Sequence, residues 1–263
     1  MKHVTLLLAL LLIGFLNAQE SFPYKRPELL INKEVTVKPM HPGSEEAFGG
    51  YENFYSDSNW SKIYKENNRS KTSSSSLTNR TFKVVSSEFT SDTPFPYHVF
   101  KLEDKQTKEL IYYMYNMKLA RNDIYPFTVV GGLDVPADFY CDYVETYGGD
   151  NPIYFIENMS IYKLQKKMLK GKAKYSLNLI MTAEPLTQEG IVVNLENNMS
   201  ITRPDYPIIS DKRTFGSFEL TAKEIELLKN NKITGFTLGK TKGFIGDREA
   251  IAIKEGLKCL MSK

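Results

Sequence analysis

Residues 97–117, YHVFKLEDKQTKELIYYMYNM, decide the fold class of this chain. The runs 97–102 and 110–117 each alternate between apolar and polar positions, which is typical of half-buried strands. The residues between the two runs are polar or charged, as the connection of a hairpin requires. The stretch therefore predicts two antiparallel strands.

The same pattern continues towards the C-terminus. Further strands are predicted at 139–144, 153–164, 174–182, 190–195, 215–220 and 233–238. At 139–144 the density of aromatic and β-branched residues favours a strand over a helix. The chain is therefore rich in β-structure well beyond the hairpin.

Two upstream segments, 30–37 and 77–84, resemble each other. Each consists of a leucine, a polar turn with Asn and a basic residue, and then an alternating run. Each predicts a strand that is entered from a tight turn. The similarity fits either an internal two-fold repeat or two unrelated strands. Between the two segments, residues 66–76 are almost entirely polar and predict an exposed loop.

The last part of the chain predicts two helices. Thr221 and Glu224 have the spacing of a capping box, which marks a helix start. A second helix is expected from Asp247, with apolar residues such as Leu257 on its inner face. The predicted fold class is mainly β (α+β), with antiparallel strands and two C-terminal helices in a sandwich- or barrel-like arrangement.

The N-terminus carries the three parts of a secretory signal. A basic start precedes the apolar run 4–16, and Ala18 provides a small residue at the exit. The run is too short to span a bilayer, which takes about 20 residues. We expect residues 1–18 to be a signal peptide and the protein to be secreted or periplasmic.

A domain boundary is expected near Pro126 and Gly131-Gly132, because proline and glycine interrupt regular secondary structure. The predicted organisation is an N-terminal β-rich region, 19–125, and a C-terminal β-rich region, 126–263, that ends in the two helices. No second apolar run reaches spanning length, so we expect no transmembrane segment in the mature chain.

Charge and cysteine content limit the function classes. The chain has 34 Lys and Arg against 31 Asp and Glu, a balance too even for nucleic-acid binding. The only cysteines, Cys141 and Cys259, either form a disulfide in an oxidising compartment or remain as buried thiols. The sequence leaves both alternatives open, because spacing along the chain does not give the distance between the two Cα atoms.

No catalytic, cofactor or metal site is predicted. The mature chain has two histidines, His41 and His98, and neither a His-Glu-x-x-His nor a Gly-x-Ser-x-Gly motif. Asp134, Asp138 and Asp142 recur every four residues, but on a strand they would be spread too far to hold one ion.

Charge is concentrated at one place in the sequence, a cluster of lysines. The cluster consists of Lys163, Lys166, Lys167, Lys170, Lys172 and Lys174 around Gly171. It is interpreted either as the solvated end of a hairpin or as a patch for polyanions such as acidic glycans or membrane head groups.

The layout of residues 126–263, in which several strands lead to a capped helix, a strand and a final helix with a cysteine, resembles that of small exported bacterial β-rich proteins without an assigned activity. This resemblance supplies no catalytic residue. We expect a non-enzymatic binding or structural domain at the cell envelope, with a glycan or another envelope component as partner. The alternative is a glycan or peptidoglycan hydrolase that works through two carboxylates.

Overall fold

The computed structural model describes residues 20–90, 96–117, 125–158, 161–182, 190–210 and 212–263, and the expected signal peptide lies outside them. The chain divides into two compact units between Val135 and Pro136. The expected boundary at 125 is displaced towards the C-terminus because strand β6 (Phe127–Val129) pairs with strand β1 (Glu34–Val37) of the first unit.

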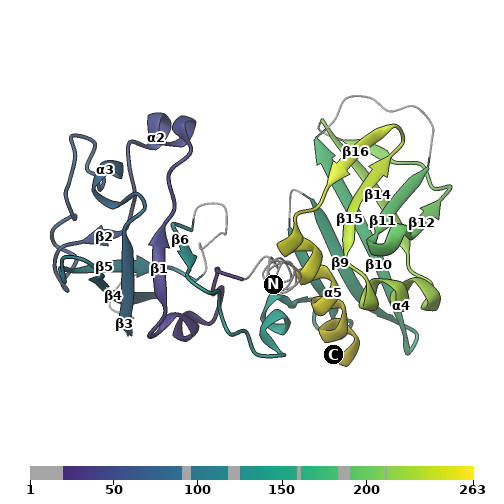
Figure 1. Ribbon diagram of the computed structural model, residues 1–263. Helices are drawn as coiled ribbons and strands as arrows, with labels where there is room; N and C mark the ends of the chain where they lie inside the picture. The colour runs from purple at the N-terminus through teal and green to yellow at the C-terminus, as the bar shows by residue number, and fades with distance from the viewer. Residues whose placement is uncertain (1–19, 91–95, 118–124, 159–160, 183–189, 211) are drawn as a thin grey trace, which may run out of the picture. The chain divides into compact units, whose positions relative to one another are not determined.

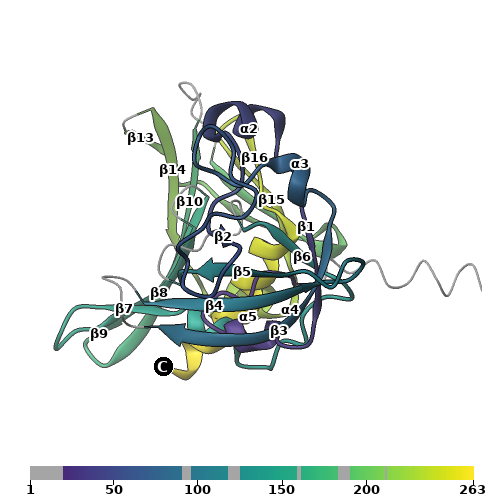
Figure 2. The same ribbon diagram turned by 90° about the vertical axis from the view of Figure 1, so that its left-hand side faces the viewer.

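The first unit is built around one antiparallel sheet (Figure 1). Its elements after β1 are α2 (Pro42–Phe48), β2 (Phe54–Tyr55), α3 (Ser74–Leu77), β3 (Thr81–Thr90), β4 (Tyr97–Asp104), β5 (Leu110–Tyr115) and β6, and η1 (Pro27–Leu30) precedes β1. The strand order is β2-β5-β4-β3-β1-β6. Figure 2 shows β3, β4 and β5 side by side. The predicted hairpin is confirmed as β4 and β5.

The sheet of the first unit curls around a core of aromatic rings. Phe54 of β2 and Phe127 of β6 lie on the two outermost strands, yet their ring centroids are 5.7 Å apart. The ring of Tyr113 of β5 contacts both, with centroids 4.8 Å from Phe54 and 5.0 Å from Phe127. A flat sheet would keep its edge strands several strand spacings apart, about 4.8 Å each. The aromatic contacts therefore bring the two edges together.

The two similar segments of the first unit are related by a local two-fold arrangement. The amide of Asn32 donates to the carbonyl of Val84 at 2.8 Å, and the amide of Asn79 donates to that of Val37 at 2.9 Å. Both asparagines have a left-handed backbone, with φ of 66° and 62°. Asn tolerates this conformation better than most residues, which explains its place before each strand. The similarity in sequence therefore corresponds to equivalent turns on neighbouring, antiparallel strands.

The serine-rich segment is more ordered than its composition predicts. Thr72 is fully buried and exchanges two backbone hydrogen bonds with Tyr51, and Leu77 is also fully buried at the end of α3. Residues 68–70 are exposed, as expected. The prediction of one continuous exposed loop over 66–76 is wrong, because these two side chains anchor the segment in the core.

The second unit contains two antiparallel sheets and two longer helices (Figure 1). Its elements are η2 (Phe139–Tyr143), β7 (Glu145–Tyr147), β8 (Ile153–Asn158), β9 (Tyr162–Leu169), β10 (Lys172–Thr182), β11 (Ile191–Leu195), η3 (Glu196–Asn198), β12 (Ser200–Arg203), β13 (Ile208–Ser210), β14 (Arg213–Glu219), α4 (Ala222–Asn230), β15 (Ile233–Leu238), β16 (Thr241–Phe244) and α5 (Asp247–Ser262). The larger sheet has the order β13-β14-β10-β9-β8-β7, and the smaller sheet has the order β12-β11-β15-β16.

Glycines allow the layers of the second unit to approach closely. A Cβ at Gly216 of β14 would come within 2.5 Å of Leu238 of the smaller sheet. A Cβ at Gly256 of α5 would come within 2.4 Å of Ile156 of the larger sheet. Both positions therefore need glycine for packing rather than for backbone freedom, and both belong to contacts that enclose one continuous apolar core.

Two predictions for this unit are wrong in detail. Residues 139–143 form a 3₁₀ helix rather than a strand, and Tyr140 stacks on Tyr143 at 5.8 Å, as side chains three residues apart do in that helix. Residues 153–164 form parts of two strands, β8 and β9, because the chain reverses direction between them.

The helix predictions are confirmed. Thr221 and Glu224 form the full capping box at the start of α4. The last helix begins at Asp247 and buries Ile253, Leu257 and Leu260. None of the helices among the described residues is both long and apolar enough to cross a bilayer. The fold is β-rich α+β, as expected.

Candidate functional site

The lysine cluster lies on a β-ribbon made by β9 and β10. Leu169 pairs with Lys172, so the loop consists of Lys170 and Gly171 alone. Both loop residues have positive φ, 50° and 77°. Such two-residue loops match the twist of the strands that they join, and glycine makes the second position accessible. The prediction of a hairpin end at Gly171 is therefore confirmed.

Side chains of the ribbon alternate between two faces of the sheet. Tyr162 and Leu164 of β9 point into the core, and so do their partners Leu179 and Leu177 of β10. The intervening positions form the outer face, because neighbouring residues of a strand point in opposite directions.

This alternation separates the six predicted lysines. The outer face carries Lys163, Lys167, Lys172 and Lys174, and Lys170 lies in the loop. We call these five residues the lysine ribbon. Lys166 belongs to the core face, and only 6% of it is exposed. Its ammonium lies 6.0 Å from the ring centroid of Tyr175, which is its neighbour across β10. The inclusion of Lys166 in the patch is therefore wrong.

The charges of the lysine ribbon are only partly compensated. Lys174 forms an ion pair with Glu219 at 2.8 Å. The Lys163 ammonium lies 4.0 Å from the ring centroid of Phe155, a cation–π distance. Within the part of the chain that the structure describes, Lys167, Lys170 and Lys172 have no ion pair.

Two lysines of the ribbon also face each other directly. Lys167 and Lys174 are cross-strand partners on the same face. Directly opposed like charges destabilise a sheet. The arrangement concentrates positive charge on the outer face, and Glu219 compensates the charge of Lys174.

Apolar side chains share the outer face with these lysines. Ile208 of β13, Phe215 of β14 and Ile180 of β10 form one cross-strand row, in which Ile208 is 66% exposed. At the other end of the sheet, Leu169 is 41% exposed and Tyr147 of the edge strand β7 is 74% exposed. The surface therefore combines lysines with exposed apolar side chains, and the acids Glu219 and Glu145 lie on the same face. Figure 2 shows β13, β14 and β10 next to one another.

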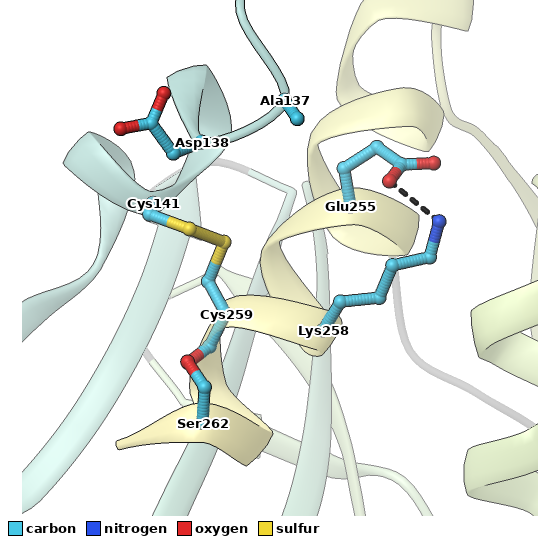
Figure 3. Close-up of a pocket in the computed structure, with 7 residues that line it drawn as sticks. All are labelled: Ala137, Asp138, Cys141, Glu255, Lys258, Cys259 and Ser262. Carbon is cyan, nitrogen blue, oxygen red and sulfur yellow. Dashed lines mark hydrogen bonds and ion pairs between the residues drawn. A yellow bond between two sulfur atoms is a disulfide. The ribbon is translucent and has the colours of Figure 1, made fainter.

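The two cysteines form a disulfide between η2 and α5, with Cα atoms 5.2 Å apart. Beside it lies an open cavity of about 270 Å³, drawn in Figure 3. Two acids line this cavity. Glu255 is turned towards Lys258, 2.6 Å away, and the carboxylate of Asp138 points away from Glu255. The two carboxylates do not converge on a common point.

A second cavity, of about 250 Å³, lies in the first unit and has one acid in its lining, Asp104. The carboxylate of Asp104 is almost fully buried and pairs with Arg80 at 2.8 Å. It also accepts hydrogen bonds from the amides of Gln106 and Thr107, at 2.8 and 2.7 Å. Burial acts to raise the pKa of Asp104, but these donors outweigh it and the pKa is lowered. The group is therefore an ionised anchor for the β4–β5 turn.

The remaining sequence candidates each have separate partners. His41 caps α2 by accepting from the amide of Gly43 at 3.3 Å. His98 of β4 lies 5.2 Å from the ring of Phe89, and burial lowers its pKa. Asp134 pairs with Lys33 at the surface. Among the described residues, no three His, Cys, Asp or Glu side chains are grouped as metal ligands are.

Sequence reasoning missed the apolar partners of the lysines. Phe155 and Tyr147 lie on strands that precede β9, and their positions beside the ribbon follow from the pairing of β8 with β7 and β9. The sequence signal that could have found them is the alternation of side chains along a strand, which places Phe155 on the outer face of β8.

Fold and site together define a β-rich protein of two units whose second unit presents a cationic and apolar sheet face. No protein-family model, curated protein or solved structure matches the chain.

Proposed function

We propose that the protein is an exported, non-enzymatic binding domain of the cell envelope that holds a negatively charged partner on its lysine ribbon. The observation that carries the proposal is the group Lys167, Lys170 and Lys172, which among the described residues have no ion pair and lie beside Lys174, the partner of Glu219. Uncompensated charge of one sign on a sheet face attracts polyanions and increases their local concentration.

The position of the ribbon also supports binding. Residues 170–174 are all exposed, and β10 presents Lys172 and Lys174 on the same side. A folded protein gains little from such lysines, because exposed charges contribute about 0–1 kcal/mol even when they are paired. A partner that supplies negative charge would be stabilised by the lysine ribbon, which accounts for the grouping of these lysines.

The hydrolase alternative receives less support. It requires two carboxyls roughly 5–9.5 Å apart at the bottom of a cleft. In the cavity beside the disulfide the two acids diverge, and the cavity beside Asp104 has one acid in its lining. We therefore place binding first.

The test compares two triple variants of the mature protein. One replaces Lys167, Lys170 and Lys172 with Gln, and the control replaces the exposed Lys62, Lys83 and Lys223 with Gln. Both variants therefore lose three positive charges. Binding to two soluble polyanions, heparin and polygalacturonate, and to vesicles that contain phosphatidylglycerol is measured at low and at physiological salt.

We expect the wild type and the control to bind at least one of these probes in a salt-dependent manner, and the ribbon variant to lose most of that binding. Equal binding by the two variants would refute the proposal, and so would a wild type that binds none of the probes. Release of reducing ends from a glycan by the wild type would favour the hydrolase.

A further inference from the structure

The end of the β9–β10 hairpin extends beyond its neighbouring strands. The pairing of β9 with β8 stops at Lys167, and the pairing of β10 with β14 stops at Ser176. Between Met168 and Ala173, the strand pairing that the structure describes is within the hairpin alone, as Met168 pairs with Ala173. We call residues 168–173 the hairpin tip.

The hairpin tip presents apolar side chains that the described residues of the second unit leave exposed. Leu169, on the outer face, is 41% exposed, and Ala173, on the opposite face, is also exposed. A strand normally buries one of its two faces. Here the exposed apolar groups are found on both, so the packing of the sheet does not account for them.

Cationic groups flank Leu169, whose cross-strand partner is Lys172. Lys170 and Lys172 lie within the tip, and Lys167 and Lys174 form the next cross-strand pair. Long lysine side chains can keep the ammonium in a polar layer while their methylene groups lie along apolar surface.

This combination separates two kinds of polyanion. An acidic glycan would use the charges of the lysine ribbon and leave Leu169 in water. A bilayer with anionic lipids offers negative head groups to the lysines and, a few ångströms deeper, acyl chains to the leucine. Of the two, the bilayer surface is complementary both to the lysines and to Leu169.

We infer that the partner of the lysine ribbon is the surface of an anionic lipid bilayer, into whose interface the hairpin tip inserts Leu169. The inference rests on the proposed function and names its ligand class. Lys167, Lys170 and Lys172 bind head groups, and the tip enters the interface without crossing it.

Vesicle sedimentation tests the inference. The mature protein is mixed with vesicles of phosphatidylcholine, with or without phosphatidylglycerol, and heparin binding is measured in parallel. The informative variant is Leu169→Ser. Its matched control is Leu110→Ser, because Leu110 of β5 is also 41% exposed. Circular dichroism and the melting temperature establish that both variants are folded.

We expect binding to vesicles with phosphatidylglycerol and little binding to phosphatidylcholine alone. Leu169→Ser should weaken vesicle binding about tenfold and leave heparin binding unchanged. The triple replacement of Lys167, Lys170 and Lys172 with Gln should weaken vesicle binding on the order of a hundredfold, because each lysine near an anionic surface contributes a factor of about five.

The two proposals fail in different ways. Binding to heparin or polygalacturonate without binding to anionic vesicles would overturn the bilayer as partner and leave the proposed function standing. Absence of binding to every probe would overturn both. Vesicle binding that Leu169→Ser and Leu110→Ser reduce equally would overturn insertion of the tip.

Discussion

Removal of the disulfide between Cys141 and Cys259 should destabilise the second unit strongly without abolishing its fold. The bond joins η2 to α5 across a sequence separation of 118 residues. Closure of a loop of this length lowers the entropy of the unfolded chain by an amount equivalent to about 4.9 kcal/mol at 25 °C. Measured effects are often smaller, so this figure is the upper bound of the expected loss.

The last helix has other attachments that keep the unit folded when the bond is absent. Ile253, Leu257 and Leu260 are at most 1% exposed in the core of the second unit. The guanidinium of Arg248 donates to the hydroxyl of Tyr143 in η2 at 2.8 Å. Burial of one such aliphatic side chain contributes about 1.5–3 kcal/mol. We therefore expect a lower stability and a retained structure, with a fall in melting temperature on the order of 15 °C.

The assay uses the double variant Cys141→Ala/Cys259→Ala and calorimetry with and without reductant. Reductant should lower the melting temperature of the wild type and leave that of the variant unchanged. Hydrogen exchange separates the units: amides of β15 should lose protection in the variant, and amides of β4 in the cysteine-free first unit should not. Two titratable thiols in the denatured, unreduced wild type, or a variant that melts with the wild type, would refute the reasoning.

Three further outcomes are expected. Asp104→Asn should cost about 1.5–3 kcal/mol at neutral pH, because Arg80 loses the more buried of its two carboxylate partners and keeps Glu109 at 3.1 Å. Since the folded-state pKa of Asp104 is lowered, the wild type should lose this stabilisation as the pH falls below about 4. Urea titrations of the two proteins should therefore converge at low pH, and a constant difference would contradict the prediction. Gly216→Ala should lower the unfolding free energy by about 1–3 kcal/mol through overpacking between the sheets, whereas Gly149→Ala, which has open space around its Cβ, should change it little. Thr221→Ala should lower the unfolding free energy by about 1 kcal/mol through loss of the helix cap. An unchanged urea midpoint for Gly216→Ala or for Thr221→Ala would contradict the prediction for that variant.

Predictions from the sequence succeeded where the determining interactions are local. The capping box at Thr221 involves atoms three residues apart, and its residue types alone define it. The β4–β5 hairpin follows from alternation on both sides of a polar connection. The two-residue loop at Gly171 needs positive φ, which its glycine supplies readily.

Predictions failed where distant residues decide the structure. Residues 139–143 have a strand-like composition but form a 3₁₀ helix, whose Phe139 and Tyr140 are buried and which the disulfide joins to α5. The segment around Thr72 is polar, yet it pairs with Tyr51, about twenty residues earlier. Neither partner is visible in a local window of the sequence.

The lysine ribbon lies between these two cases. Lys166 and Lys167 are adjacent and chemically identical, but the alternation of a strand buries one beside Tyr175 and exposes the other beside Lys174. The face to which each residue of β9 points can be predicted from Leu164, which is apolar and so belongs to the core face. The register that places Lys167 opposite Lys174 depends on the loop at Gly171. A shift of that register by one residue would move the lysines of one strand to the core face. The short loop therefore fixes the concentration of positive charge on the outer face, which is the property that the proposed binding function requires.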